Sequence, residues 1–229
     1  MTEFLLALGV FLLSHTIPTR TGLRHKLTAA VGERRYLLLY SILSIALLIW
    51  LISAALRAPF VLLWNLAQWQ YDVPIALMLP ASMLFVGGLF ASNPLSISFS
   101  RASFDAARPG LVGITRHPLL WAFALWSFAL LFPNGDLVSV ILFGGFTLFS
   151  LAGMALVDRR KRTALGDEWR GLAAQTSIIP LAALVTRRAS PRWSAATLVT
   201  TVAGGAALYF ILLRLHPVVF GIDPLAGLG

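Results

Sequence analysis

Residues 36–56 read YLLLYSILSIALLIWLISAAL, a stretch without a charged side chain. A helix needs about 20 mostly apolar residues to cross the hydrocarbon core of a bilayer, so this stretch predicts a transmembrane helix. Other apolar stretches of adequate or nearly adequate length lie at 2–17, 73–92, 111–132, 137–157 and 194–215. We therefore expect an all-α fold, a polytopic bundle of about six transmembrane helices.

The composition of the 229-residue chain agrees with a membrane protein. Hydrophobic residues make up 58% and charged residues 12% of the chain, against about 25% charged residues in an average soluble domain. Mean hydropathy is +0.82. This composition excludes a water-soluble enzyme and intrinsic disorder. The chain has no cysteine, which excludes disulfides, thiolate metal sites and cysteine nucleophiles together.

The basic residues predict the orientation of the spans. All but two of the 18 Lys and Arg residues fall in alternate loops at 18–35, 93–116 and 158–193, and the two exceptions are Arg57 and Arg214. By the positive-inside rule, these three loops are expected in the cytoplasm, with both termini on the non-cytoplasmic side. The net charge of +9 then reflects topology and contact with anionic lipids rather than nucleic acid. We expect a multi-pass protein of the bacterial inner membrane.

The segment 158–193 is the largest extramembrane piece. Its first part predicts a polar helix with a break at Gly166, and the apolar residues 178–185 are too few to cross a bilayer, so they suit an interfacial or re-entrant segment. We expect Asp158 to pair with the adjacent Arg159 beneath this loop.

The chain divides in this interpretation into two parts. A membrane domain covers residues 1–190, and residues 191–229 add one transmembrane helix and a short tail.

Several kinds of chemistry leave no trace in the sequence. It contains no Walker-type phosphate loop, no G-x-S-x-G elbow and no H-E-x-x-H helix. None of the nine acidic residues falls inside the apolar body of a predicted span. Because ion and proton pathways usually need an intramembrane carboxylate, a pump or an ion-coupled transporter is disfavoured.

Two histidines stand at membrane depth in the predicted topology. His15 lies in the last turn of the first span and His117 in the first turns of the fourth, so both belong to the cytoplasmic leaflet. Ionisable residues at this depth are rare and functional by default. Two imidazoles at one depth on different helices can ligate one metal ion, and the usual device is a bis-histidine haem b. The alternative is that each histidine only hydrogen-bonds a carbonyl at headgroup level.

The neighbouring arginines suit such a cofactor. Arg20, Arg24 and Arg116 lie just on the cytoplasmic side of the two histidines, where they are expected to bind the haem propionates. His25 is expected to be solvated and His216 interfacial. A zinc site is disfavoured because no third ligand lies beside His15 and His117.

Four blocks carry a resemblance to a known family. They are SHTIPTRTGLR at 14–24, GERRY at 32–36, GITRHPLLW at 113–121 and DRRKRTALGDEWRGLAAQTSIIP at 158–180. With these blocks the chain resembles the NnrU family of bacterial inner-membrane proteins over about residues 1–185 and is more distantly similar to zeta-carotene isomerase.

The resemblance implies a cofactor and two fields of function. By position, His15 and His117 correspond to the haem b ligands of the isomerase. The implied activity is haem-dependent cis–trans isomerisation of a hydrophobic polyene, or a role in nitrite and nitric oxide respiration, that is, denitrification. Whether the chain is an enzyme stays open here. The expected partners are the lipid bilayer and a hydrophobic small molecule or nitric oxide, and an oligomer is compatible with the sequence.

Two alternatives remain open. The R-H-P block also resembles isoprenylcysteine and phospholipid methyltransferases, which use S-adenosylmethionine. Leu120 and Ala122 stand where that pattern has Tyr and Gly, and Trp169 replaces its usual tyrosine. The other alternative is a cofactor-free membrane assembly factor in which both histidines are structural.

Overall fold

The computed structural model describes residues 1–100, 102–189 and 192–226, apart from the side chains of Thr19 and Arg20. In this part of the chain the secondary structure is helical, except for a single bridge between Leu62 and Asp136. The all-α prediction is therefore confirmed.

Four helical segments among the described residues are long and apolar enough to cross a membrane. They are α3 (Glu33–Leu56), α4 (Trp69–Phe90), α7 (Leu137–Leu165) and the continuous segment Ala195–Phe220. A fifth span results if Thr2–Pro18 and Leu23–Val31, which bend by 76°, count as one. The structure thus supports four to five spans by length and composition. The expected sixth corresponds to the helix Pro118–Leu131, which is apolar but shorter than the others.

The chain forms two compact units, and we describe each by itself. Unit 1 comprises Met1–Trp64 and Asp136–Leu142, and unit 2 comprises Asn65–Gly135 and Phe143–Gly229.

Unit 1 is built on two packed helices and a bend. Helix α1 (Thr2–Arg20) packs on α3, and α2 (Leu23–Val31) leads from one to the other. Phe4 and Leu51 are fully buried in this unit. Gly22 stands at the bend with φ of +69°, a left-handed conformation that glycine adopts without steric cost.

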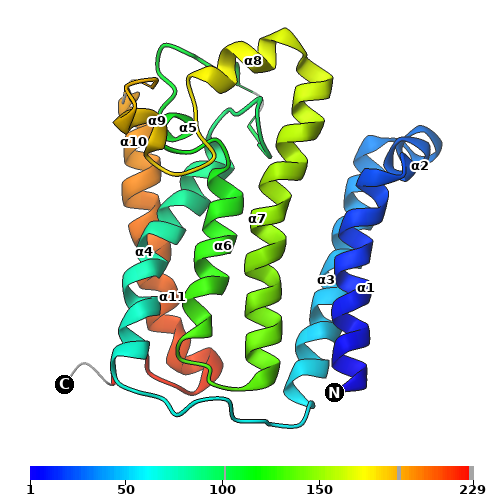
Figure 1. The fold of residues 1–229 in the computed structure, drawn as a ribbon, viewed down its shortest axis with the longest axis vertical. Coiled ribbons are helices and arrows are strands. Elements are labelled where there is room, and N and C mark those ends of the chain that lie inside the picture. The colour runs from blue at the N-terminus through cyan, green and yellow to red at the C-terminus, as the bar shows by residue number, and fades with distance from the viewer. Residues whose placement is uncertain (101, 190–191, 227–229) are drawn as a thin grey trace. The chain divides into compact units, whose positions relative to one another are not determined.

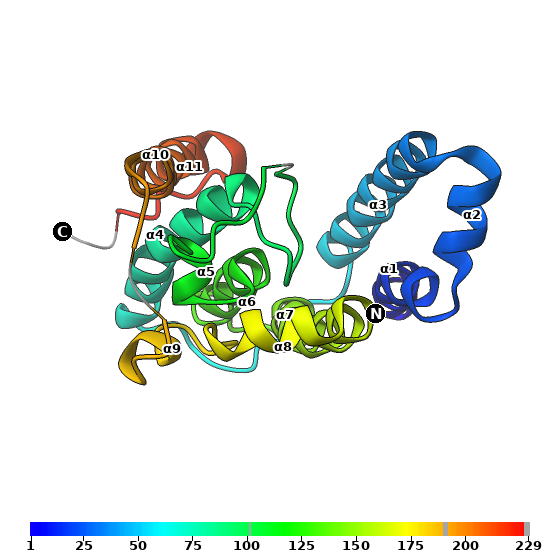
Figure 2. The same cartoon turned by 90° about the horizontal axis from the view of Figure 1, so that it is seen from above.

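Unit 2 is a helical bundle with a cap at one end (Figures 1 and 2). Its bundle helices are α4, α6 (Pro118–Leu131), α7 from Phe143 onward and the run of α10 (Ala195–Val199), η1 (Thr200–Gly204) and α11 (Gly205–Phe220). Glycines allow two pairs of helices to approach closely. A Cβ at Gly88 of α4 would meet Leu119 of α6 at 3.0 Å, and a Cβ at Gly205 of α11 would meet the Met83 Cα of α4 at 2.5 Å.

The predicted span 111–132 is broken near its start. Helix α5 covers only Leu111–Ile114, and α6 begins at Pro118. Proline disfavours helical dihedrals in the residue before it, and His117 accordingly has φ of −121° and ψ of 61°. Pro118 has no N–H to donate to the Ile114 carbonyl, and this carbonyl accepts instead from the Leu181 amide at 2.8 Å.

The cap of unit 2 holds the segments between the bundle helices. Helices α5, α8 (Asp167–Ala174) and α9 (Ala182–Val185) gather there with the loop that follows α4 (Figure 1). Gly166, with φ of +56°, separates α7 from α8 at the position where the sequence predicts a helix break. The apolar stretch that follows forms only the short α9.

Candidate functional site

His117 is the centre of a buried polar cluster in unit 2. It is the N-cap residue of α6, and its side chain is fully buried. The Nε2 atom lies 3.0 Å from Oδ1 of Asp158, and Nδ1 lies 2.7 Å from Oγ of Ser96. Because a carboxylate only accepts hydrogen bonds, we assign a proton to Nε2; in a neutral ring Nδ1 then accepts from the Ser96 hydroxyl. Both ring nitrogens therefore have protein partners.

Asp158 joins His117 to Arg116. Its second carboxylate oxygen, Oδ2, accepts a hydrogen bond from Nη1 of Arg116. The side chains of Arg116 and Asp158 are only 8% and 13% exposed. The expected pair between Asp158 and Arg159 is wrong, because Asp158 pairs with Arg116 instead. The helix break before Pro118 brings Arg116 to the carboxylate, whereas Arg159 is exposed.

Arg116 is held by every part of its side chain. Nε donates to the Thr176 hydroxyl at 3.0 Å, and Nη2 donates to the Ala173 carbonyl at 3.1 Å. The Arg116 carbonyl accepts from Nδ2 of Asn93 at 2.9 Å. A buried guanidinium with this many acceptors is fixed in one orientation.

The backbone around Arg116 is paired with the segment after α8. The Arg116 amide donates to the Ser177 carbonyl at 2.7 Å, and the Thr115 hydroxyl donates to the Ile178 carbonyl at 2.9 Å. Trp121 Nε1 also donates to Ile178, at 2.7 Å. The R-H-P block and the 158–180 block of the sequence therefore meet in one site.

Trp169 lies between two arginines beside the cluster. The guanidinium carbons of Arg116 and Arg162 are 5.2 Å and 5.7 Å from its ring centroid, which is cation–π distance. Its indole Nε1 is buried and has no hydrogen-bond partner among the described residues.

His15 belongs to unit 1 and is bound differently from His117. Its Nδ1 donates to the Phe11 carbonyl at 2.8 Å, one turn earlier in α1. A carbonyl only accepts, so Nδ1 carries the proton and the lone pair of a neutral ring is on Nε2. The ring packs edge-on to Tyr40, with centroids 5.7 Å apart. The two histidines thus have opposite tautomers and lie in different units.

The remaining predicted residues have separate places. Arg24, 44% exposed, lies 3.9 Å from Glu33 within unit 1, and the side chain of Arg20 lies outside the described residues. His25 is exposed on α2. His216 lies 2.8 Å from the Ile222 carbonyl through Nδ1 and is half-buried in the last turns of α11. No group of three or more His, Asp or Glu side chains suited to a metal ion occurs in the part that the structure describes.

Sequence reasoning missed three members of the cluster. Ser96 and Thr176 are common loop residues with no pattern to mark them, and Asn93 precedes Pro94 in a pair that is typical of a helix-ending turn rather than of a site. All three are buried and bonded to Arg116 or His117. The arrangement can hold a charge pair away from water and fix the orientation of one imidazole.

Comparison with known proteins gives one match. A family model described as NnrU protein matches residues 3–224, nearly the whole chain and beyond the last block that carries the resemblance in the sequence. No curated protein and no solved structure matches the chain.

Proposed function

The chain belongs to the NnrU protein family, and from this membership we propose that it is a bacterial inner-membrane protein that binds haem b through His15 and His117. A bound haem would supply an iron centre, either for cis–trans isomerisation of a hydrophobic polyene or for a nitric oxide-linked role in denitrification. The cytoplasmic placement of the basic loops and the six-span topology are part of the proposal.

The tautomer of His15 is the observation that carries the proposal. Its Nδ1–H is held by the Phe11 carbonyl, so the lone pair of the ring is on Nε2. A backbone carbonyl bound to one ring nitrogen is the usual way in which proteins orient a metal-ligating histidine. His15 also follows an apolar run in α1, where an ionisable side chain is costly without a role.

His117 can ligate a metal ion through Nε2 only by giving up its hydrogen bond to Asp158. Its Nε2 proton is donated to Asp158, and ligation through this atom would require the proton to move to Nδ1 and that hydrogen bond to break. Asp158 would keep its bond to Arg116, so the exchange would not leave the carboxylate unpaired. The Ser96 hydroxyl would then accept from Nδ1–H instead of donating to Nδ1, and it would continue to orient the ring.

The arginines differ in how well they suit the propionates. Arg24 is loosely paired and partly exposed, so its guanidinium is able to bind a carboxylate. Arg116 already donates from each of its three nitrogens, to Thr176, Asp158 and Ala173. We therefore assign the propionate role to Arg24 rather than to Arg116.

Absorption spectroscopy tests the proposal. The full chain, produced with haem available and purified in mild detergent, should show a Soret band that shifts on reduction. His15→Ala should abolish the band, whereas His25→Ala and His216→Ala, which alter histidines outside the proposed ligand pair, should leave it unchanged. Equal loss in all three variants would contradict the assignment of His15.

The second ligand needs its own readout. His117→Ala should convert a six-coordinate low-spin spectrum into a five-coordinate high-spin one while haem remains bound. A wild-type protein that is colourless and binds S-adenosylmethionine would overturn the proposal in favour of the methyltransferase interpretation. A colourless protein without either ligand would favour an assembly factor.

A further inference from the structure

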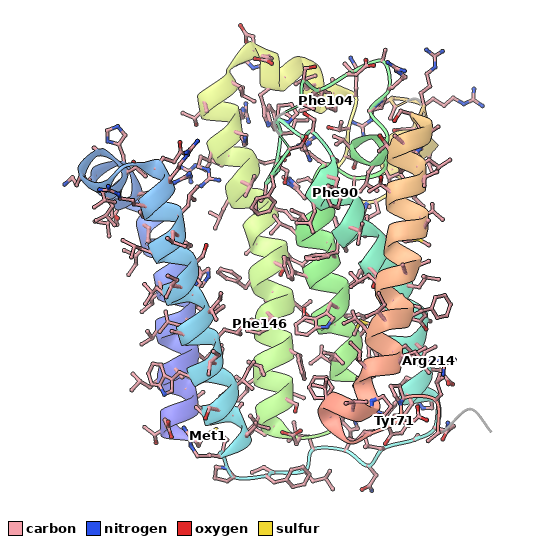
Figure 3. All side chains as sticks on the ribbon, turned by 180° about the vertical axis from the view of Figure 1, so that it is seen from behind. Met1, Tyr71, Phe90, Phe104, Phe146 and Arg214 are labelled. Carbon is pink, nitrogen blue, oxygen red and sulfur yellow. The ribbon has the colours of Figure 1, made fainter. Side chains whose placement is uncertain are left out.

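A second candidate site lies in the cap of unit 2 and shares Thr176 with the His117 cluster. It is a pocket of about 320 Å³ between the loop before α5 and the segment after α8. Its polar lining consists of Gln175, Thr176, Arg187, Arg188 and Arg192. Apolar residues, among them Phe104 and Leu172, form the rest of the wall, and Figure 3 shows Phe104 at this end of the unit.

The three pocket arginines have no acidic partner among the described residues. The neighbouring carboxylates bind other arginines: Asp105 pairs with Arg108 at 2.9 Å and Asp167 with Arg170 at 2.8 Å. The hydrogen bond from Arg108 also lowers the pKa of Asp105. The positive charge of the pocket is therefore not neutralised from within this part of the chain.

The backbone holds these arginines in defined positions. The Gly110 amide donates to the Arg192 carbonyl at 3.1 Å and ties the two walls together. Arg187 has φ of +55°, a left-handed conformation that costs a non-glycine residue energy and is concentrated at functional sites. Nε of Arg188 donates to the Thr186 hydroxyl at 3.0 Å.

Topology alone does not account for this arrangement. The positive-inside rule explains why arginines are common at this end, and Arg159 and Arg160 meet that requirement as exposed residues on α7. Neither of these two lines the pocket. Arg187, Arg188 and Arg192 are exposed as well, but these three line one pocket together with apolar residues.

We propose that this pocket binds a phosphate group, presented by an anionic phospholipid headgroup or by a small phosphorylated molecule. Arginine binds phosphate through paired hydrogen bonds, and basic pockets at the cytoplasmic side of membrane helices recognise anionic headgroups. The proposal does not depend on haem. Thr176, which lines the pocket and accepts from Arg116, belongs to both sites.

Matched charge variants test the proposal in the full chain. Native mass spectrometry in detergent measures retention of dioleoyl phosphatidic acid against dioleoyl phosphatidylcholine, and the phosphatidic acid should bind more tightly. The variant R187Q/R188Q should weaken this binding by about tenfold or more, because each charge-assisted hydrogen bond contributes at least that much. R159Q/R160Q removes the same charge from exposed α7 and should leave the affinity within about twofold.

Three further results complete the test. R187K/R188K keeps the charge and should retain more binding than the glutamine pair, which separates a lost site from a misfolded variant. Competition by inorganic phosphate in calorimetry would identify a free phosphate ligand, and binding of the lipid alone would identify a headgroup; either supports the site. Equal loss in R187Q/R188Q and R159Q/R160Q would show only general surface attraction and would overturn the proposal.

Discussion

At the residue scale, the pair of Arg116 and Asp158 explains how charges persist inside a mostly apolar unit. Removing two charges from water is costly, and the attraction between them compensates only when the remaining donors and acceptors are also satisfied. Here Thr176, Ala173 and His117 supply those partners. The pair is therefore stable as part of the whole cluster.

Loss of one partner should be severe. Asp158→Ala leaves the Arg116 guanidinium buried and unpaired, and it should lower the free energy of unfolding by about 3–5 kcal/mol. Asp167→Ala, which breaks the exposed pair with Arg170, should cost less than about 1 kcal/mol. Unfolding in mixed dodecyl maltoside and SDS micelles measures both. Similar losses in the two variants would mean that the cluster does not stabilise the fold.

The sequence identifies the charged members of this site better than its neutral ones. Arg116 and His117 are conspicuous because they sit at the start of an apolar run. Asp158 can also be identified from the sequence, but its partner cannot. Adjacency along the chain favours Arg159, whereas only the tertiary fold brings Arg116 to Asp158. Ser96 and Thr176 bind through single hydroxyls that no spacing rule predicts.

At the element scale, apolar length predicts where helices occur, and proline and glycine predict where they stop. Five of the six predicted spans coincide with continuous helix to within a few residues, and the span 111–132 is interrupted between α5 and α6. The helix break at Gly166 is visible in the sequence because only glycine adopts its left-handed backbone readily. The complete break before Pro118 is larger than the kink that proline alone would cause. Its cause is tertiary, since the segment 177–181 supplies the partners of the freed backbone groups.

Helix packing in unit 2 should depend on individual glycines. Gly205→Ala would place a Cβ 2.5 Å from the Met83 Cα and 2.8 Å from its amide nitrogen. Because backbone atoms cannot yield as a side chain can, α4 and α11 must separate, at a cost of about 1–3 kcal/mol.

A matched variant isolates this effect. At Gly145 in α7, an added Cβ meets nothing within 4 Å, so Gly145→Ala should leave stability unchanged or raise it by up to about 1 kcal/mol through helix propensity. Thermal unfolding in detergent compares the two alanine variants. If Gly205→Ala were as stable as Gly145→Ala, the close approach of α4 and α11 would be wrong.

At the scale of the whole molecule, the two basic loops of unit 2 lie at the same end of its helical bundle (Figure 1). The loop after α4 and the segment after α7 both lie in the cap (Figure 1). Tyr71 and Arg214 lie at the opposite end of the unit (Figure 3). The gathering of the basic loops at one end of the bundle agrees with their alternation along the sequence. The distribution of Lys and Arg therefore predicts this arrangement without coordinates.

Cysteine labelling tests the membrane topology, because the natural chain has no cysteine and each introduced thiol is unique. Cysteines at Ser103 and Gly171, both exposed in the cap of unit 2, should react with a membrane-impermeant maleimide only after spheroplasts are permeabilised. A cysteine at Leu66, which precedes α4, should react in intact spheroplasts. Thr2→Cys, at an exposed position at the start of α1, decides the number of spans. Its labelling in intact spheroplasts means that the chain crosses the membrane before α2, whereas labelling only after permeabilisation would remove the first span and place the N-terminus in the cytoplasm.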